Sequence, residues 1–476
     1  MYENAIELKE IHPMYEKTVE RAKKLFLDGY RIVIGLSGKD SCAAAVCVVQ
    51  GLLEAVKIAP KNVAGLHILT TNTTLDNMVI MSYIKDLHQD LNEYGKNMEL
   101  PIFTKILKPA LSMNPIVELA GRGKLLGTPK TSVNSKSCAD DWKIKPVKKE
   151  LANMRKLYQT TKIINISGSR SSESKARSKS LSLRNESPTE IVKTDLGFSL
   201  SIIMDWTLND VWSLFKAIDF GDIESFSDRF DLLTKHYSAG NNGVCDLFAG
   251  DINKNTKSCG SRFGCVTCGF AGESDKSLEA QIAIDPKTYG FMEPLNKLRS
   301  FLLNTLFDYK HRTMIGHKID DGFIKVGVNS YSMSYRMALL RYILTIQAEA
   351  FEAHGYHKIQ LVDYDVLIAI QYHWSKSGYE QEPGMAFKIW HEVVNHGVSY
   401  PIPDSTMHEQ IAIPKYKFFP LEEYIDRADV TGLDDESLDN RFSSIARVYF
   451  KDGETKRVVR YEENKTFSVV TKDGLA

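Results

Sequence analysis

The chain has 476 residues, of which 43% are hydrophobic and 25% are charged, and its formal net charge at pH 7 is zero. No apolar run is long enough to span a bilayer, and the first 17 residues carry charges where a signal peptide needs a continuous apolar stretch. We therefore expect a soluble cytoplasmic protein with no membrane partner. The length exceeds what one simple core accommodates, which indicates an α/β domain with smaller attachments.

The first half of the chain alternates short apolar runs with helix-like stretches. Four runs predict buried strands, at 31–35, 63–69, 102–107 and 162–166. Two stretches predict helices, at 40–56 and 80–94. Such alternation predicts an α/β fold with a doubly wound parallel sheet, whose ligands bind at the carboxyl ends of the strands.

The second half of the chain changes character twice. Gly, Asn, Asp, Ser and Cys dominate from Gly240 to Gly272, which indicates loops. Residues 295–394 have a mainly helical composition, with Met337–Ala350 as the clearest helix. Two β-rich runs around Lys451-Asp-Gly-Glu-Thr455 predict a small hairpin at 446–461.

The segment Gly35-Leu-Ser-Gly-Lys-Asp-Ser41 lies directly between a predicted strand and a predicted helix. A loop in that place directs backbone N–H groups and the positive end of the helix dipole at an anion. Gly38 allows the main chain to approach a phosphate closely, and Lys39 adds a positive charge. Ser37 and Ser41 add hydroxyl donors. The segment is not a Walker A loop, because the Gly-x4-Gly-Lys spacing is absent.

These residues resemble the Ser-Gly-Gly-Lys-Asp-Ser loop of the PP-loop ATP pyrophosphatases, which cleave ATP to AMP and pyrophosphate while adenylating an acceptor. Leu36-Ser37 stands where that superfamily usually has Ser-Gly. The resemblance implies an adenine nucleotide alpha-hydrolase-like fold and ATP as a ligand. Asp40 is expected either to hold Mg²⁺ or to orient the loop.

Two later segments resemble further blocks of the phosphoadenosine-phosphosulfate reductase branch, in the same order. Leu69-Thr-Thr-Asn-Thr-Thr-Leu-Asp-Asn77 matches the adenosine-site segment, with Asn72 in place of its usual Asp. Gly168-Ser-Arg-Ser-Ser-Glu-Ser174 matches the Gly-x-Arg-x-x-Glu-Ser block that closes on the phosphates. The resemblance implies nucleotide contacts from Thr71, Gly168, Arg170 and Glu173.

Four of the seven cysteines are arranged as C-x13-C-x5-C-x2-C, at Cys245, Cys259, Cys265 and Cys268. A C-x2-C pair brings two sulfurs within ligand distance of one metal centre. Zinc and a [4Fe–4S] cluster both accept four thiolates, so the spacing leaves the two alternatives open. Cys42 and Cys47 lie in the first predicted helix, where core packing is the better interpretation.

The sequence around the cysteines resembles the DndC family of DNA phosphorothioation sulfurtransferases. The similarity includes Ser258-Cys-Gly-Ser-Arg-Phe-Gly-Cys-Val-Thr-Cys268, Gly121-Arg-Gly123 and Tyr335-Arg336, and it covers roughly residues 28–400. It implies that the four cysteines hold a [4Fe–4S] cluster. It also implies three partners: DNA, a cysteine desulfurase as sulfur donor, and other phosphorothioation subunits.

Residues 121–180 contain 15 Lys or Arg and only four Asp or Glu, so this segment carries a charge of +11. It is either a solvated face or a surface for polyanions such as ATP phosphates and a DNA backbone. Cys138 lies within it, among lysines that favour the thiolate. We interpret Cys138 as a sulfur carrier or an alternative cluster ligand, with an unreactive thiol as the remaining alternative.

The expected reaction is ATP-dependent adenylation of a DNA phosphate oxygen, followed by displacement of AMP by sulfur. Lys39, Asp40, Arg170 and Cys138 are the candidate catalytic residues. Three alternatives remain open: an adenylyl or phosphoadenylyl sulfate reductase, a tRNA or nucleobase thiolase, and a catalytically inactive adaptor. The reductase usually needs a cysteine near its C-terminus, and this chain has none after Cys268.

The composition and the motifs together predict four segments. These are an ATP pyrophosphatase domain at 1–235, an iron–sulfur region at 236–285, a helical region at 286–410 and a tail with the hairpin at 411–476.

Overall fold

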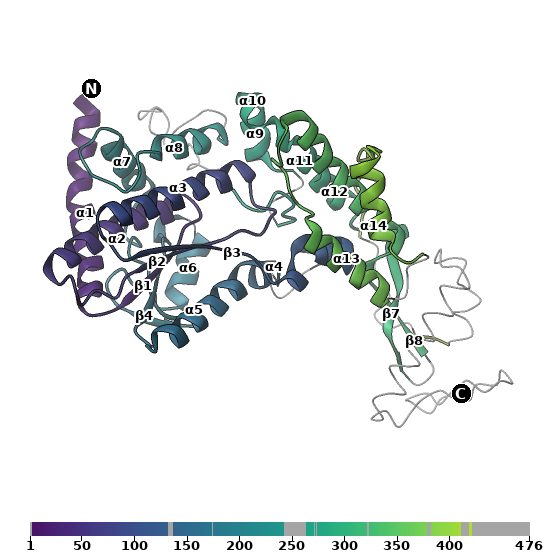
Figure 1. Ribbon diagram of the computed structural model, residues 1–476, viewed down its shortest axis with the longest axis horizontal. Coiled ribbons are helices and arrows are strands. Elements are labelled where there is room, and N and C mark those ends of the chain that lie inside the picture. The colour runs from purple at the N-terminus through teal and green to yellow at the C-terminus, as the bar shows by residue number, and fades with distance from the viewer. Residues whose placement is uncertain are drawn as a thin grey trace. The chain divides into compact units, whose positions relative to one another are not determined.

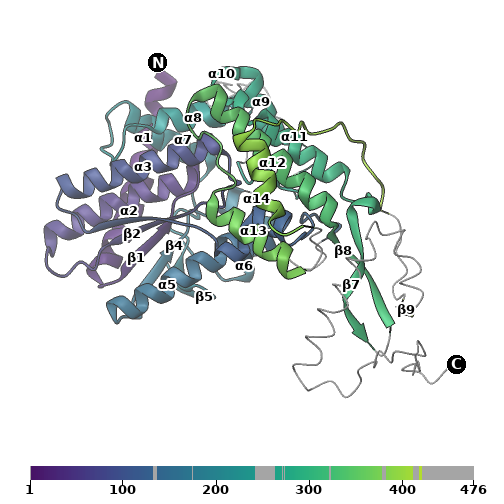
Figure 2. The ribbon, with the colours of Figure 1, turned by 45° about the vertical axis from the view of Figure 1, so that its right-hand side comes forward.

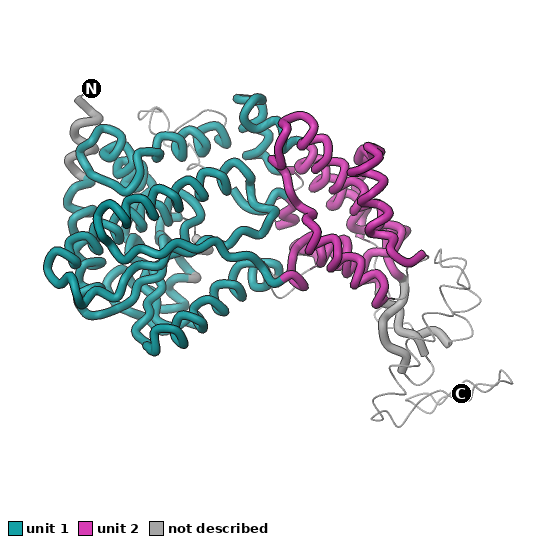
Figure 3. The backbone as a smooth tube through the Cα atoms, in the orientation of Figure 1, with its two compact units in different colours: residues 1–110, 136–266, 275–293 teal, residues 111–135, 267–274, 294–476 magenta. Residues whose placement is uncertain are grey.

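The structure of the protein is a computed structural model. It describes the backbone of residues 2–131, 137–173, 175–241, 263–270, 272, 274–320, 323–377, 382–410 and 418–420. The chain forms two compact units, coloured separately in Figure 3. Unit 1 comprises residues 1–110, 136–266 and 275–293, and unit 2 comprises residues 111–135, 267–274 and 294–476. The four segments predicted from the sequence stay a prediction.

Unit 1 is built on a six-stranded sheet with the strand order β3-β2-β1-β4-β6-β5. Its strands are β1 (Arg31–Gly35), β2 (Leu66–Thr71), β3 (Ile102–Leu107), β4 (Ile163–Ile166), β5 (Val192–Thr194) and β6 (Gly197–Leu200). Neighbouring strands are parallel except for β5, which pairs antiparallel with β6. The predicted α/β fold with a mostly parallel sheet is therefore confirmed.

Ten helices are described in unit 1. They are α1 (Tyr2–Leu27), α2 (Lys39–Ile58), α3 (Met78–Asn97), α4 (Ser137–Ala139), α5 (Lys145–Tyr158), α6 (Lys175–Leu183), α7 (Leu208–Asp219), α8 (Phe230–Ala239), α9 (Lys276–Ile284) and α10 (Pro286–Tyr289). In Figures 1 and 2, α2 and α3 cover one face of the sheet and α5 covers the other.

The period of two along each strand explains why both faces of the sheet are covered. Ile32 and Ile34 of β1 belong to the large core formed with α1, α2, α3, α7 and α8. Val33, between them, packs on the opposite face with Leu151 and Met154 of α5. Such near-continuous apolar strands are typical of a parallel sheet buried on both sides.

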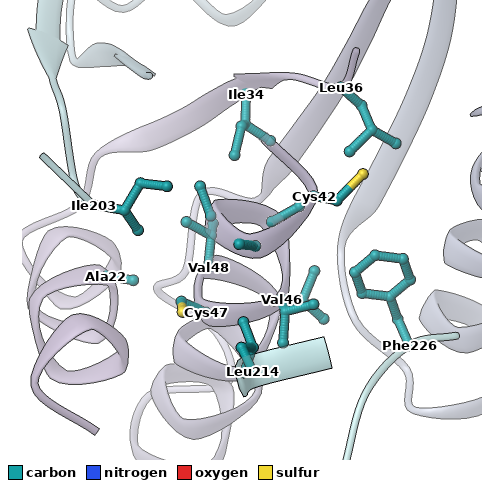
Figure 4. Packing of buried hydrophobic residues seen from close by; sticks show 14 of the residues in the cluster. Ala22, Ile34, Leu36, Cys42, Val46, Cys47, Val48, Ile203, Leu214 and Phe226 are labelled. Carbon is teal, nitrogen blue, oxygen red and sulfur yellow. The ribbon is translucent and has the colours of Figure 1, made fainter. Parts of the chain in front are cut away.

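Helix α2 forms the centre of the larger core, as Figure 4 shows. Cys42 and Cys47 are both fully buried there, at 0% exposure, which confirms the core-packing interpretation. Burial raises the pKa of both thiols well above the ordinary value. Among the described helices, α2 is long and apolar enough to cross a membrane, contrary to the expectation that no run of the chain is, but 72% of that window is buried inside the protein. Its apolar composition is thus explained by its place in the core.

Unit 2 has a mainly helical described part. Its helices are α11 (Glu293–Asn304), α12 (Met333–His354), α13 (Tyr364–Ser377) and α14 (Met385–Trp390), and α11 begins at the boundary with unit 1. A small antiparallel sheet accompanies them, with β7 (Arg312–Asp320), β8 (Phe323–Tyr331) and β9 (Phe418–Pro420).

Residues 295–394 are mainly helical, as expected, and the β7–β8 hairpin within them was not expected. Each of its strands carries regularly spaced β-branched or aromatic residues, and Asp321-Gly322 between them is a hairpin turn signal. These strand and turn signals were present in the sequence, but the helical composition of the flanking segments outweighed them. The hairpin predicted at 446–461 lies outside the described residues.

Candidate nucleotide pocket and cysteine segment

A cavity of about 670 Å³ opens at the carboxyl ends of β1, β2 and β4 in unit 1. The strand order reverses direction between β1 and β4, because β2 and β3 lie on one side of β1 and β4 lies on the other. Parallel α/β sheets bind their ligands at such a switch point. The volume is within the range of about 300–1,000 Å³ that is typical of small-molecule sites.

The cavity is lined by all nine residues predicted to contact a nucleotide. They are Ser37, Gly38, Lys39, Asp40, Ser41, Thr71, Gly168, Arg170 and Glu173. The first five follow β1, Thr71 ends β2, and the other three follow β4. The structure thus brings together motifs that are separated by more than a hundred residues, while their individual roles stay predictions.

Ser41 shapes the loop that follows β1. Its Oγ accepts hydrogen bonds from the backbone N–H groups of Ser37, at 2.9 Å, and Gly38, at 3.0 Å. The same hydroxyl donates to the carbonyl oxygen of Gly38 at 2.8 Å. These three hydrogen bonds of Ser41 stabilise the turn that leads into α2. The Ser41 hydroxyl was predicted to donate to a ligand, and in the structure it stabilises the loop.

Arg170 and Lys39 converge on the carboxylate of Asp40. Arg170 Nε donates to Asp40 Oδ1 at 2.7 Å, and Lys39 Nζ lies 3.4 Å from Asp40 Oδ2. Arg170 is 2% exposed, and its Nη1 donates to the hydroxyl of Ser172, which in turn donates to the carbonyl of Trp206. These contacts fix the guanidinium at the edge of the cavity.

This pairing bears on the two roles expected for Asp40. Both carboxylate oxygens are engaged by cationic side chains, which fits a residue that orients the loop. Each oxygen keeps a further lone pair, so the role of Asp40 as a Mg²⁺ ligand stays a prediction. Among the described residues no group of three or more His, Cys, Asp or Glu is placed to hold a metal ion.

Two aromatic residues that no sequence motif predicted complete the cavity. Tyr237 of α8 places its hydroxyl 3.4 Å from the backbone nitrogen of Lys39, and Lys39 Nζ lies 4.8 Å from the centre of its ring. Phe263 packs edge-on against Tyr237 at 4.9 Å. Both rings line the cavity, and they provide an apolar wall against which a nucleotide base can stack.

The C-x2-C segment lies beside the loop that joins β2 to α3. Val266 N donates to the carbonyl of Leu75 at 2.6 Å, and Asp76 and Cys265 form an antiparallel bridge. Phe263, two residues before Cys265, lines the cavity. The cysteine segment is therefore attached to the same sheet edge as the nucleotide loop.

Asp76 is a site residue that motif reasoning missed. Its Oδ2 accepts from the backbone N–H and the hydroxyl of Thr73, at 2.8 and 2.9 Å. Its Oδ1 accepts from Lys143 Nζ at 3.0 Å and from Cys265 Sγ at 3.9 Å. Lys143 also lines the cavity, so Asp76 connects the cavity wall to the cysteine segment.

The structure places the remaining predicted residues as follows. Three of the predicted cysteines are partly buried and form no disulfide: Cys138 on α4, Cys265 and Cys268. None of these three lines the cavity. Cys245 and Cys259 lie outside the described residues. The [4Fe–4S] cluster expected on the four cysteines stays a prediction.

The arrangement has the parts needed to bind a polyphosphate beside an aromatic wall. A helix N-terminus, two fixed cations and a close backbone turn meet in one cavity. No model of a known protein family matches the sequence. No curated protein matches it either.

Proposed function

We propose that the protein is a PP-loop ATP pyrophosphatase with an adenine nucleotide alpha-hydrolase-like fold, which acts as a DNA sulfurtransferase. The main support is the cavity at the sheet's switch point, where the loop 37–41 and the block 168–173 line one space. Resemblance to the DndC family supplies the proposed acceptor, a non-bridging oxygen of a DNA phosphate. A cytoplasmic location is part of this proposal.

In the first step the acceptor oxygen attacks the α-phosphorus of ATP and pyrophosphate leaves. Lys39 and Arg170 neutralise charge on the phosphates, and the N-terminus of α2 faces the same space. Asp40 keeps both cations in place through its two oxygens. Catalysis is then mainly positioning and charge neutralisation, with no dedicated general base.

In the second step the outer sulfur of a cysteine persulfide attacks the adenylated DNA phosphorus and AMP leaves. A thiol then cleaves the resulting P–S–S–Cys bond, which leaves the phosphorothioate and a disulfide. Sulfur originates from a cysteine desulfurase and reaches the site through Cys138 or the cysteine segment, with other phosphorothioation subunits completing the complex. A [4Fe–4S] cluster on Cys245, Cys259, Cys265 and Cys268 would supply redox and sulfur-relay chemistry. The bridge between Asp76 and Cys265 keeps that segment close to the cavity.

Pyrophosphate release tests the first step. The anaerobically purified protein is incubated with ATP, Mg²⁺, duplex DNA and sulfide, and pyrophosphate is measured by a coupled assay. Lys39→Ala is expected to lower the rate by at least about 100-fold, because it removes a preorganised cation from the reacting phosphates. Its iron content is expected to equal that of the unchanged protein.

Lys57→Ala is the matched control, since Lys57 is an exposed lysine in the last turn of the same helix. We expect it to keep the rate within about twofold, as exposed substitutions usually have small effects. If Lys39→Ala releases pyrophosphate as fast as Lys57→Ala, the loop is only a turn and the proposal fails.

A further inference from the structure

Among the described residues of unit 2, one buried arginine has no acidic partner. Arg336 of α12 is 3% exposed, and its Nε donates to the carbonyl of Tyr331 at 2.8 Å. Within the described residues its two terminal nitrogens make no hydrogen bond, and no carboxylate pairs with it. Burial lowers the pKa of this guanidinium to about 10. A buried cation in this state is costly unless an anion completes its coordination.

Arg312, a second buried arginine of unit 2, shows how such a side chain is normally satisfied. Its Nη1 donates to the carbonyl of Val328 at 2.7 Å, and its Nη2 donates to the carbonyl of Leu306. Both terminal nitrogens of Arg312 therefore donate hydrogen bonds to backbone carbonyls. The terminal nitrogens of Arg336 make no such bond to a described residue, so they can donate to a ligand.

The main chain at Gly123 lies directly against the Arg336 guanidinium. A Cβ atom at this position would come within 2.2 Å of Arg336 Nε, and the φ of +67° also favours glycine. Tyr331 N donates to the carbonyl of Gly123 at 2.7 Å, which fixes the turn. The turn thereby places Arg122 and Lys124, whose side chains are 44% and 38% exposed, on either side of Gly123.

Helix α13 adds two more basic residues. Trp374 Nε1 donates to the carbonyl of Ala120 at 2.8 Å, so α13 is held against the segment that leads into the turn. His373 and Lys376 flank Trp374. Burial lowers the pKa of His373, and the charges of Arg122, Lys376 and Arg336 lower it further.

Four cations, with the neutral imidazole of His373 between them in the chain, form what we call the cationic cluster: Arg122, Lys124, Arg336 and Lys376. Its acidic partner among the described residues is Glu118, which lies 2.9 Å from Lys124 Nζ and 3.7 Å from Arg122 Nη1. Glu118 does not pair with Arg336. Among the residues that the structure describes, positive charge thus exceeds negative charge around the Arg336 guanidinium, whose terminal nitrogens make no hydrogen bond there.

We propose that this cationic cluster binds a phosphate group, free or in a nucleic acid backbone, in addition to the phosphates of the nucleotide cavity. The planar fork of Arg336 donates two parallel hydrogen bonds to phosphate oxygens. Arg122 and Lys376, at the exposed rim, add attraction that salt screens. The bound anion supplies the counterion that the buried guanidinium lacks.

Calorimetric titration with inorganic phosphate tests the site, with excess α,β-methylene-ATP present to fill the nucleotide cavity. The full-length protein is expected to bind one phosphate. Arg336→Gln is expected to weaken this binding at least about tenfold, since it removes a charged donor pair. A separate titration with α,β-methylene-ATP alone measures binding at the nucleotide cavity. Loss of binding at the nucleotide cavity and loss of binding at the cationic cluster are therefore distinguished.

Because a buried substitution can impair folding, Arg122→Gln/Lys376→Gln provides a second variant at exposed positions. We expect it to weaken phosphate binding at least about threefold. Lys297→Gln/Lys310→Gln removes two exposed lysines of the same unit outside the cluster and is expected to bind phosphate normally. No phosphate binding by the unchanged protein, or equal binding in all variants, would overturn the inference.

Anisotropy of a labelled 12-base-pair duplex distinguishes the two sources of phosphate. If the cluster takes a backbone phosphate, duplex affinity falls in the same two variants and inorganic phosphate competes. If it takes free phosphate, phosphate binding falls in the variants while duplex affinity is unchanged. Either result supports the site and assigns its ligand.

Discussion

Gly168 is the residue on which the shape of the nucleotide cavity most depends. A Cβ atom there would lie 2.8 Å from three backbone atoms, namely the oxygen of Asp40 and the nitrogen and Cα of Ser41. Main-chain atoms move only with the loop itself, unlike the end of a flexible side chain. Glycine therefore allows the loops after β1 and β4 to touch, which also brings Arg170 to Asp40.

We predict that Gly168→Ala weakens ATP binding at least about tenfold and destabilises unit 1 by about 1–3 kcal/mol, the usual cost of overpacking. Equilibrium dialysis and urea unfolding measure the two effects. Gly290→Ala is the control, because a Cβ atom there meets nothing within 4 Å. If ATP binds equally well to Gly168→Ala and Gly290→Ala, the close contact does not shape the binding site.

His88 of α3 is linked through the Thr70 hydroxyl to Leu36, the first residue of the loop that follows β1. The Thr70 hydroxyl donates to the carbonyl of Leu36 at 2.6 Å, so its oxygen accepts from His88 Nε2 at 2.8 Å. Burial lowers the pKa of His88 from its ordinary 6.5 to about 4. The unfolded chain therefore binds this proton more readily than the folded protein between these two pH values.

The free energy of unfolding therefore decreases as pH falls from about 6.5 toward 4. Above pH 6.5 the imidazole of His88 has little effect on it, because His88 is neutral in both the folded and the unfolded chain. We predict that between pH 7.5 and 5.0 His88→Gln loses about 2 kcal/mol less stability than the unchanged protein. Urea unfolding at the two pH values measures this difference. His354→Gln, at an exposed histidine, is expected to lose as much as the unchanged protein does. Equal losses in both variants would contradict the assignment.

Sequence reasoning identified those cavity residues that belong to contiguous motifs, such as Ser37 to Ser41 and Arg170. It missed Tyr237, Phe263 and Asp76 for a physical reason. An isolated tyrosine in a helix, or an aspartate in a loop, has no local pattern that tells which distant element it contacts. Only the packing of α8 and of the cysteine segment onto the sheet brings them to the cavity.

At the scale of elements, the predicted strands and helices were accurate wherever apolar periodicity was strong. The strands expected at 31–35 and 102–107 have the same bounds as β1 and β3, and the helix expected at 40–56 is α2. Short strands such as β5 carry too few residues to show a period, and their pairing with β6 depends on tertiary contacts.

Backbone hydrogen bonds pair residues 264–266 with residues 75–77. This pairing attaches the backbone at Cys265 to the loop that follows β2, beside the nucleotide cavity. Asp76 stabilises it through its hydrogen bonds with Thr73 and Lys143. A thiolate ligand keeps its place only if the backbone that carries it is held. The iron content of the protein is thus expected to depend on a carboxylate that is not itself a ligand.

We predict that Asp76→Ala lowers the iron bound per chain after anaerobic reconstitution by about tenfold, the lower end of the loss of about 10- to 100-fold in metal affinity that follows removal of such partners. Asp76→Asn, which keeps one accepting oxygen, is expected to retain more iron. Asp195→Ala removes a carboxylate that is 94% exposed and serves as the control. Full iron content in Asp76→Ala, measured by a colorimetric iron assay, would show that the bridge does not support the cysteines.

At the scale of the whole molecule, the basic segment 121–180 is less positive than its sequence suggests. Lys143 pairs with Asp76, Lys148 lies 3.9 Å from Asp195, and Lys124 pairs with Glu118. The segment is also divided, since residues 121–135 belong to unit 2 and residues 136–180 to unit 1. Composition alone predicts neither the pairing nor the division, because both depend on residues distant in the chain. We expect weak, salt-sensitive attraction to DNA by the protein alone.

The central claim is that a DNA phosphate oxygen attacks the α-phosphorus of ATP and leaves with AMP when sulfur takes its place. The most direct test uses duplex DNA whose non-bridging phosphate oxygens are labelled with ¹⁸O, together with unlabelled ATP, the reconstituted protein and its sulfur donor. Mass spectrometry of the released AMP is expected to show one labelled oxygen for each phosphorothioate formed. AMP without label, released at the same rate as pyrophosphate, would show that water or another acceptor is adenylated and would contradict the account.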